Sequence, residues 1–531
     1  MRPDLPSRPG RVGRLHRECP VCDSSDLEYE FIIDGFPACS CRQCWLLFLN
    51  PQPPPADCPE AGTLTGDESG VYEIRAANAA ARLAQLTRYA RLDAGRLLLA
   101  GAGPEMESEA RTRGFEAVSL SARDLDGPRL AEVPTGSIDA CLLYCALEKA
   151  ADPGTVLGEV RRALVPGGAV MVVAPTVDSR TARLFRSQWW EFNRANRFYF
   201  STDTLQNLLV KNGYGDPIIA PDDTMVSLGY LEKRLSLLPP ALRYRALRLA
   251  LSTAPGFLRD RTFRFLRSRT AMLVRVKPAR AVPRLSVIVP AFNEAATFGV
   301  MMDRLLAKTI EGVEIDVIVV EGASTDGTRD QVLRFRGDPR VRVILEDRPR
   351  GKGHAVRKGL EVADGDVILF QDADLEYDID DYDALIEPIL RHQRNFVIGS
   401  RHILKGGVWK VRRFNDAAGL AALFNLGHLV FLALFNLIYR QNLNDPFSMF
   451  KVFRRECLYG LRFESDRFDF DFEIVIKLLR KGYRPLELPV NYTARSFAEG
   501  KKVTILGDPL SWIRALVKFR YCSLYPPGNA R

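Results

Sequence analysis

The start of this 531-residue chain lacks the apolar run that a secretory signal peptide requires. We therefore expect a cytoplasmic, reducing setting. Six of the ten cysteines fall within the first 58 residues. In a reducing compartment such a cluster binds metal more often than it forms disulfides.

Internal repeats and low-complexity tracts are also lacking, and so is a composition typical of disorder. Apolar residues make up 47% of the chain and charged residues 26%, which is ordinary for a globular protein. At roughly 150 residues per domain, the length predicts three or four folding units. A single small binding module is excluded.

The excess of basic charge is local. The formal net charge is +9, yet residues 231–284 contain fourteen lysines and arginines against only Glu232 and Asp260. Prolines interrupt this segment, so we interpret residues 226–284 as a basic linker. It is either a solvated connection or an attachment to an anionic membrane surface. Nucleic acid is disfavoured as a partner, because no aromatic and basic recognition motif accompanies the charge.

Two Cys-x-x-Cys pairs form the cysteine cluster. Cys19 and Cys22 are separated by eighteen residues from Cys41 and Cys44. This is the spacing of a zinc ribbon, in which four thiolates surround one Zn²⁺. Because the protein would fill all four coordination positions of the Zn²⁺, we predict that the zinc is structural. The ribbon is placed at residues 15–60. Cys39 is an alternative ligand.

Residues 72–225 alternate between helical and strand patterns, which predicts a mostly parallel sheet. The strand at 96–100 runs into Gly101-Ala102-Gly103, and Leu147-Glu148 and the segment 162–168 follow. With the cysteine block, these features resemble a class I S-adenosylmethionine-dependent methyltransferase over residues 15–215. The resemblance implies a Rossmann-like domain in which Gly101 and Gly103 approach S-adenosylmethionine.

The chain departs from that family where the cofactor would bind. Leu99 replaces the acid before the first glycine, Glu105 replaces the third glycine, and Ser121 stands where an acid usually holds the ribose. Two interpretations of this domain remain open. The domain is either a degenerate scaffold or an active methyltransferase, in which case the protein is bifunctional.

A second α/β series begins at residue 285. Three of its predicted strands end in polar or acidic turns: Asn293-Glu294 after the first, Glu321 to Asp326 after the second, and Asp372-Ala373-Asp374 after the buried run 367–370. Two carboxylates so close together repel each other unless a cation neutralises them. A divalent ion held there would also bind a diphosphate.

In this order the motifs resemble an inverting family 2 glycosyltransferase of the GT-A fold, most like the dolichol- and polyprenol-phosphate sugar synthases. The resemblance implies a nucleotide-sugar donor and Mg²⁺ or Mn²⁺ on Asp372 and Asp374. It further implies that Lys352 lies near the diphosphate and Arg401 near a phosphate. The base and ribose of the donor would be held by Pro290, Asn293, Glu294, Glu321 and Asp326.

The acceptor side is predicted from the later segments. Asp471 or Glu473, in an alternation of aromatic and acidic residues at 468–473, is expected to act as the general base. The alternative is a half-buried strand with a solvated acidic face. A polyprenyl-phosphate acceptor is already an anion, so Arg495, Lys501 and Lys502 would then matter more, as phosphate clamps.

Residues 417–439 contain no formally charged residue. A single membrane-spanning helix there would place Asp372 and Asp374 on one side of the membrane and Asp445 and the later residues on the other. We therefore expect this segment to lie at the membrane interface or to pack on the protein.

We thus predict an α/β protein with a zinc ribbon, a Rossmann-like methyltransferase domain and, over residues 285–531, a GT-A glycosyltransferase domain. It would be peripheral on the cytoplasmic face of a membrane. A binding scaffold without turnover is the remaining alternative.

Overall fold

The computed structural model describes residues 13–54, 69–222, 225–229, 231–232, 242–253, 255–256, 261–264, 269–278, 280–403, 418–493 and 507–525. The chain divides into two compact units, with the boundary between Pro278 and Ala279. Each unit is built around its own central sheet.

The first unit begins with a small antiparallel sheet of order β1-β2-β3-β8. Its strands are β1 (Leu27–Ile33), β2 (Phe36–Cys41), β3 (Leu47–Leu49) and β8 (Phe198–Tyr199). Because β3 pairs with β8, almost 150 residues away in the sequence, the cysteine-rich segment is joined to the following domain by backbone hydrogen bonds.

The main sheet of this unit has the order β5-β4-β6-β7-β12-β9. The strands β4 (Gly95–Ala100), β5 (Phe115–Leu120), β6 (Ile138–Tyr144) and β7 (Leu164–Pro175) are parallel. The strand β12 (Arg269–Val276) runs antiparallel between β7 and β9 (Tyr214–Pro221). Leucine, valine and alanine side chains fill the core on both faces, as a sheet covered by helices requires.

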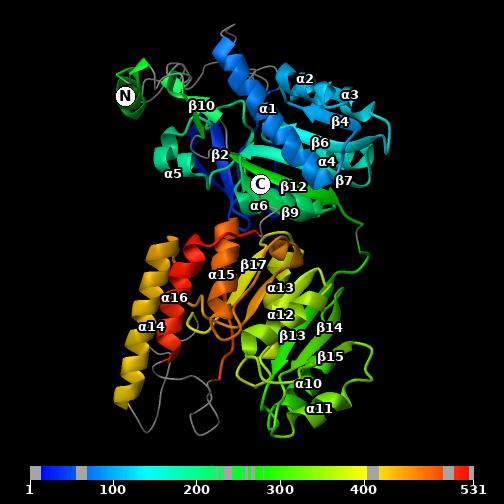
Figure 1. Ribbon diagram of the computed structural model, residues 1–531, viewed down its shortest axis with the longest axis vertical. Helices are drawn as coiled ribbons and strands as arrows, with labels where there is room; N and C mark the ends of the chain where they lie inside the picture. The colour runs from blue at the N-terminus through cyan, green and yellow to red at the C-terminus, as the bar shows by residue number, and fades with distance from the viewer. Residues whose placement is uncertain are drawn as a thin grey trace. The chain divides into compact units, whose positions relative to one another are not determined.

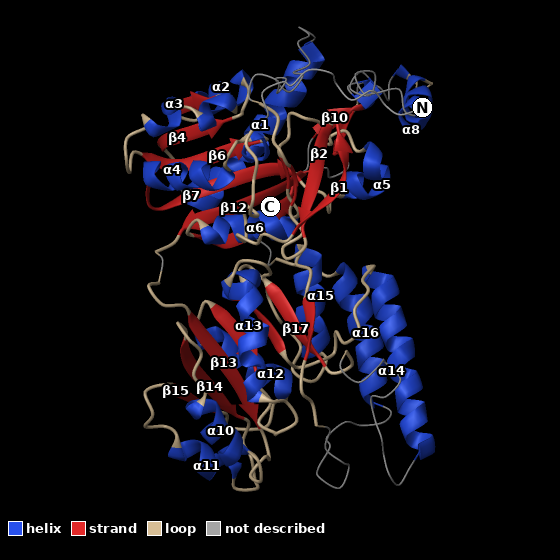
Figure 2. Cartoon of the chain, turned by 180° about the vertical axis from the view of Figure 1, so that it is seen from behind, coloured by secondary structure: helices blue, strands red, loops and turns tan. Residues whose placement is uncertain are grey.

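The main sheet is flanked by α1 (Ser69–Ala90), α2 (Pro104–Thr112), α3 (Pro128–Ala131), α4 (Pro153–Ala163) and α6 (Thr202–Lys211) (Figures 1 and 2). The helix α5 (Arg180–Phe185) lies away from it, beside the small antiparallel sheet. Asp152 caps α4 by accepting hydrogen bonds from the N–H groups of Gly154 and Thr155, and Ser201 forms a capping box with Thr204 at the start of α6.

The position of β12 corrects the predicted linker. Residues 269–276 lie inside the sheet, and Ala271 to Val274 are buried. Two of the basic residues that suggested a linker lie near the ends of this strand, where Arg269 donates to the hydroxyl of Tyr144 and Arg275 to the carbonyl oxygen of Tyr89. Other described parts of the segment form β10 (Met225–Ser227) paired with β11 (Thr262–Arg264), and the helix α8 (Leu242–Ser252).

The second unit contains a seven-stranded sheet of order β15-β14-β13-β16-β18-β17-β19. The strands β13 (Arg284–Ala291), β14 (Glu314–Glu321), β15 (Val341–Leu345) and β16 (Val367–Phe370) are parallel. The strand β18 (Lys451–Arg454) runs antiparallel to β16 and to β17 (Phe396–Ser400), while β19 (Leu486–Pro489) is parallel to β17.

The described helices of this unit are α10 (Phe298–Ala307), α11 (Thr328–Arg334), α12 (Lys352–Val362), α13 (Tyr382–Leu390), α14 (Ala418–Tyr439), α15 (Phe470–Lys481) and α16 (Gly507–Tyr521). The helices α14 and α16 lie at one side of the unit, beyond α15, and the other helices lie nearer the sheet (Figure 1). The parallel strands β13, β14 and β16 all end at one edge, so their following loops meet there. This is the edge at which open α/β sheets bind ligands.

Candidate functional site

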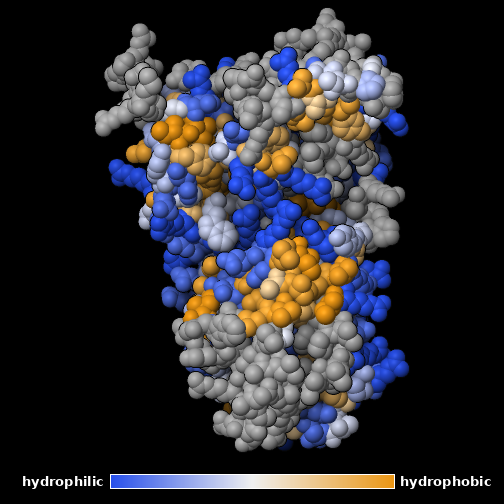
Figure 3. All heavy atoms as spheres, turned by 90° about the vertical axis from the view of Figure 1, so that its left-hand side faces the viewer, coloured by the Kyte–Doolittle hydropathy of each residue, from blue (hydrophilic) through white to orange (hydrophobic). Residues whose placement is uncertain are grey.

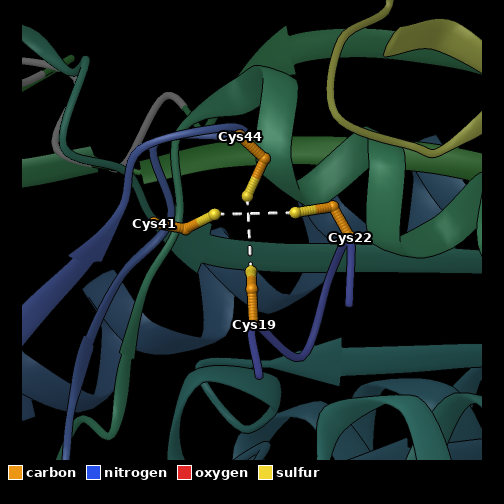
Figure 4. Close-up of side chains that lie close together, drawn as sticks. All are labelled: Cys19, Cys22, Cys41 and Cys44. Atoms are coloured by element: carbon orange, nitrogen blue, oxygen red, sulfur yellow. Dashed lines mark hydrogen bonds between the residues drawn. The ribbon is translucent and has the colours of Figure 1, made fainter. Parts of the chain in front are cut away.

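The four cysteines predicted to bind zinc lie together and are buried (Figure 4). Their Sγ atoms are all within 4.8 Å of one another, and the closest pairs, Cys19 with Cys44 and Cys22 with Cys41, are 3.4 and 3.5 Å apart. Four thiolates at about 2.3 Å from one Zn²⁺ give sulfur separations of about 3.8 Å. The donor set and its spacing therefore fit a tetrahedral zinc ion.

The two halves of the cysteine cluster have the same backbone turn. In the first half, Asp23 follows the second cysteine with a φ of 57°, and its N–H donates to the carbonyl oxygen of Cys19 at 2.9 Å. In the second half, Trp45 has a φ of 63°, and its N–H donates to the carbonyl oxygen of Cys41 at 2.8 Å. Each turn thus presents one pair of thiols, and the two pairs meet, as the sequence spacing had predicted.

The glycines of the methyltransferase-like domain are packed against the protein itself. A Cβ atom on Gly101, whose φ is +70°, would lie 2.4 Å from the carbonyl oxygen of Tyr144, and one on Gly103 would lie 2.6 Å from the carboxylate of Glu105. Glu105 is 9% exposed and forms an ion pair with Arg75 at 3.5 Å. The space that these glycines leave is therefore used by the chain's own residues.

Charged side chains fill the neighbouring part of this edge. Arg82 lies over the ring of Tyr144, 4.5 Å from its centroid, and makes two hydrogen bonds of 2.9 and 2.8 Å to buried Asp222. Arg269 donates to the Tyr144 hydroxyl at 2.8 Å. At the end of β5, the Ser119 hydroxyl donates to Glu107, and Ser121 occupies the place of a ribose-binding acid. The residues present do not fit S-adenosylmethionine.

We accordingly expect no binding of S-adenosylmethionine or S-adenosylhomocysteine. Isothermal titration of the full chain with either compound should give no saturable heat, because a carboxylate and two arginine side chains occupy the edge where the cofactor would lie. The zinc content of the same sample shows that the first unit is folded. A dissociation constant below about 100 µM would contradict this prediction.

In the second unit, the three loops at the carboxyl edge are joined by hydrogen bonds. The N–H of Asn293 donates to the Ser324 hydroxyl at 2.9 Å, and the Asn293 side-chain oxygen accepts from the N–H of Thr325 at 2.9 Å. The Thr297 hydroxyl donates to the carbonyl oxygen of Ala373 at 3.0 Å. The structure thus brings together the loops that carry the predicted donor-binding residues.

The acids of the first two loops hold these loops in place. Glu321 is fully buried and accepts from the N–H of Ser324 and from Arg329. Asp326 accepts from the N–H of Ala295 at 3.0 Å and from Thr328. Burial opposes its ionisation, but the bonds from Thr328 and Ala295 lower the pKa of Asp326. Pro290 lies in β13, and the N–H of Glu294 donates to the Thr328 hydroxyl.

Asp372 and Asp374 follow β16 as predicted. Asp374 is 6% exposed and accepts from the N–H of Glu376, and Asp372 lies 2.6 Å from the ammonium of Lys352. Gln371 holds the turn between the strand and these acids, because its amide donates to the carbonyl oxygen of Asp372 while its oxygen accepts from Tyr382. Hard carboxylate oxygens at this edge fit Mg²⁺ or Mn²⁺. Among the described residues, no third histidine, cysteine or acid completes a metal-ligating group with them.

Arg401 does not stand as a free cation for a phosphate. Its guanidinium makes two bonds of 2.7 Å to Asp445, which is fully buried, and it lies over the ring of Tyr492. Burial alone would raise the pKa of Asp445, but Arg401 lowers it. Sequence analysis overlooked this pair, which joins residues 44 positions apart.

The two candidate bases differ in accessibility. Glu473 is fully buried, pairs with Lys477 one helical turn later, and accepts from the N–H groups of Glu464 and Ser465. Asp471 lies in the first turn of α15 with 14% of its side chain exposed, 3.9 Å from Lys451. The structure therefore gives Glu473 a structural role and excludes the half-buried strand over 470–473. Arg495, Lys501 and Lys502 lie outside the described residues.

Lys451 is a part of this cluster that sequence analysis missed. It is fully buried at the start of β18, and burial lowers its pKa to about 8 although Asp471 opposes this shift. A lysine in a strand with an otherwise apolar run, Phe450 to Phe453, was the available signal.

Comparison with known proteins agrees with this division of the chain. Residues 286–461 match the family model of Glycosyl transferase family 2, and residues 79–172 match that of a Methyltransferase domain. The chain therefore combines a family 2 glycosyltransferase domain with a methyltransferase-like domain and a four-cysteine cluster.

Several curated proteins are similar to the second unit. Dolichol-phosphate mannosyltransferase of Pyrococcus furiosus is 27% identical over 218 residues, which are 41% of this chain and 59% of that protein. Glycosyltransferase AglD of Haloferax volcanii is 28% identical over 44% of this chain and 37% of its own length. Undecaprenyl-phosphate mannosyltransferase of Micrococcus luteus is 29% identical over 41% of this chain and 87% of its own length. The chain thus spans about three-fifths of the first of these relatives and about a third of the second.

Structural comparison also matches part of the chain to glucosyl-3-phosphoglycerate synthase from Mycobacterium tuberculosis in complex with uridine diphosphate. It is 20% identical, with a TM-score of 0.34, over 46% of this chain and 86% of that one.

Proposed function

We propose that the second unit transfers a sugar from a nucleotide donor to a polyprenyl phosphate, with inversion at the anomeric carbon. The observation that supports this most is the pair Asp372 and Asp374 at the carboxyl ends of the parallel strands β13, β14 and β16, inside a family 2 glycosyltransferase domain. The names of the relatives from P. furiosus and M. luteus, which include dolichol phosphate and undecaprenyl phosphate, support the acceptor class.

In this proposal the loops joined through Asn293 and Ser324 receive the nucleoside of the donor, and Asp372 and Asp374 hold Mg²⁺ or Mn²⁺. The bound ion supplies positive charge to the diphosphate as it leaves. Asp471, at the accessible start of α15, orients the acceptor. A phosphate acceptor is already ionised, so Asp471 is not required to remove a proton from it.

The direct test is product formation by the purified full chain. UDP- and GDP-sugars are supplied with Mn²⁺ and an undecaprenyl phosphate in detergent, and mass spectrometry of the lipid fraction detects a sugar-phosphate lipid. Undecaprenol without its phosphate is the matched control and should give no product. Donor hydrolysis without lipid product would contradict the acceptor class, and the absence of both would contradict sugar transfer.

An apolar surface on α14 and α16 supports an acceptor in a membrane (Figure 3). Tyr439 at the end of α14 donates to the carbonyl oxygen of Leu516 in α16, so the two helices lie side by side. Exposed apolar side chains follow helical spacing on both helices and form what we call the α14–α16 patch: Val430, Leu434 and Leu437 on α14, and Ile513, Val517 and Tyr521 on α16.

Basic side chains accompany this patch. Arg440 follows α14, and Arg514, Lys518 and Arg520 lie on α16, all of them exposed. Apolar side chains beside positive charge suit the interface of an anionic bilayer. None of the described helices combines the length and apolarity needed to cross a bilayer. We therefore propose that the α14–α16 patch lies on the membrane surface.

Replacing Leu437 and Val517 together by glutamate should lower binding to vesicles that contain phosphatidylglycerol by at least about tenfold, because two apolar contacts become charges. Vesicle co-sedimentation of the full chain measures this. Val300 on α10 is 52% exposed, and Val300→Glu serves as the control for an exposed valine elsewhere in the unit. Equal binding by the double variant and the control would argue against the patch as the contact.

A further inference from the structure

Lys352 lies among the carboxylates proposed to hold the metal. Its ammonium is 2.6 Å from Asp372, and the side chains of both residues are about one-fifth exposed. The lysine therefore places its positive charge directly beside one of the two carboxylates.

The backbone on both sides of Lys352 is held in place by close packing. Gly351 has a φ of +102°, and a Cβ there would lie 2.4 Å from the carbonyl oxygen of Asp466. A Cβ on Gly353 would lie 2.7 Å from Phe470 and from two backbone carbonyl oxygens. The N–H of His354 donates to the same carbonyl oxygen of Asp466 at 3.0 Å. Close packing against residues 465–470 explains both glycines of the Gly-Lys-Gly sequence, and it fixes the backbone from which Lys352 reaches Asp372.

The charges at this site come close to balance before any ion binds. Asp372, Asp374 and Asp471 supply three negative charges, while Lys352 and Lys451 supply up to two positive ones. Two carboxylates, one of them paired with an ammonium, offer a divalent ion few ligands. Mg²⁺ needs about six oxygens and usually takes several of them from water and from substrate phosphates.

We propose that Lys352 is a built-in counter-cation that weakens binding of the free divalent ion and thereby couples metal binding to binding of the donor diphosphate. This inference rests on the proposed function and assigns Lys352 a role in it. The negative charge of the diphosphate balances the positive charges of Lys352 and of the metal ion, and its oxygens supply further ligands to the metal. By linkage, the metal then raises the affinity of the nucleotide by the same factor as the nucleotide raises that of the metal.

The test measures Mn²⁺ binding to the zinc-loaded full chain by electron paramagnetic resonance, with and without UDP or GDP. Without nucleotide, Lys352→Met should bind Mn²⁺ about tenfold more tightly than the unchanged protein, because a positive charge a few ångströms from the ion is removed. The factor by which the nucleotide raises Mn²⁺ affinity should fall in this variant. Lys352→Arg, which keeps the charge, should preserve most of the coupling.

Lys358 offers a matched control on the same helix. It is exposed and pairs with Glu361 at 2.8 Å, so Lys358→Met removes the same charge without touching the aspartates. Equal or weaker Mn²⁺ binding by Lys352→Met than by Lys358→Met would overturn the inference, as would unchanged coupling. A damaged fold would weaken metal binding, which is opposite to the expected change. Failure of the unchanged protein to bind either nucleotide would count against the proposed function, and the comparison of Mn²⁺ affinities without nucleotide would still decide the role of Lys352.

Discussion

Replacing Asp374 by asparagine is expected to reduce sugar transfer by about a thousandfold, the upper range for loss of one electrostatic contact to a developing charge. Asp374 is almost fully buried beside Asp372 and follows β16 directly. An amide there has nearly the same shape but carries no charge, so the site holds a divalent ion far less well. Steady-state kinetics with the donor and acceptor that give product measure the effect.

Asp380 provides a control in the same loop region. Its side chain is 77% exposed, and its carboxylate lies 3.8 and 4.0 Å from Arg304 and Lys308. Asp380→Asn should therefore keep nearly full activity. Retention of one-tenth or more of the activity by Asp374→Asn would remove this residue from the proposed metal site.

Replacing Cys41 by serine is expected to release the zinc. It should also lower the midpoint temperature at which the first unit unfolds by more than about 10 °C. Binding free energy at a structural zinc site is folding free energy. For a domain of this size, each kcal/mol shifts the transition by about 2–4 °C. The four cysteines also pack in one core with Leu98 and Phe198, so the loss should reach beyond the ribbon into the main sheet of the first unit.

Metal analysis and differential scanning calorimetry measure the two effects. Cys39 lies two residues away on the same strand, is half-buried and stands outside the cluster, so Cys39→Ser is the matched control. It should retain one zinc per chain. Loss of zinc from the Cys39 variant and not from the Cys41 variant would mean that the ligand set is different from the one we assign.

The sequence predicted best those features whose chemistry is local. The spacing of Cys19, Cys22, Cys41 and Cys44 predicted the four-cysteine cluster, because two short turns determine where the thiols lie. The run 367–370 predicted a buried strand, and the aspartates that follow it are found at its end. Each of these inferences needed only a few consecutive residues.

Features that depend on distant segments were missed. The pair Arg401 and Asp445 joins residues 44 positions apart, and the role of Glu473 follows from its contacts with Lys477 and the backbone at 464 and 465. Pattern alone could not distinguish the buried acid from the accessible Asp471, since both lie in the first turn of α15. Lys352 was expected near a diphosphate, and only the folded structure shows that it contacts Asp372.

The strand β12 has a consequence for synthesis of the protein on the ribosome. The main sheet of the first unit has a gap between β7 and β9 until residues 269–276 have emerged, because β12 pairs with both strands. The nascent chain therefore cannot complete this sheet when β9 has been made, and must wait for some fifty further residues. Expression of the first unit alone accordingly requires a chain that extends through Val276, and a chain that ends near residue 225 would expose two unpaired strand edges.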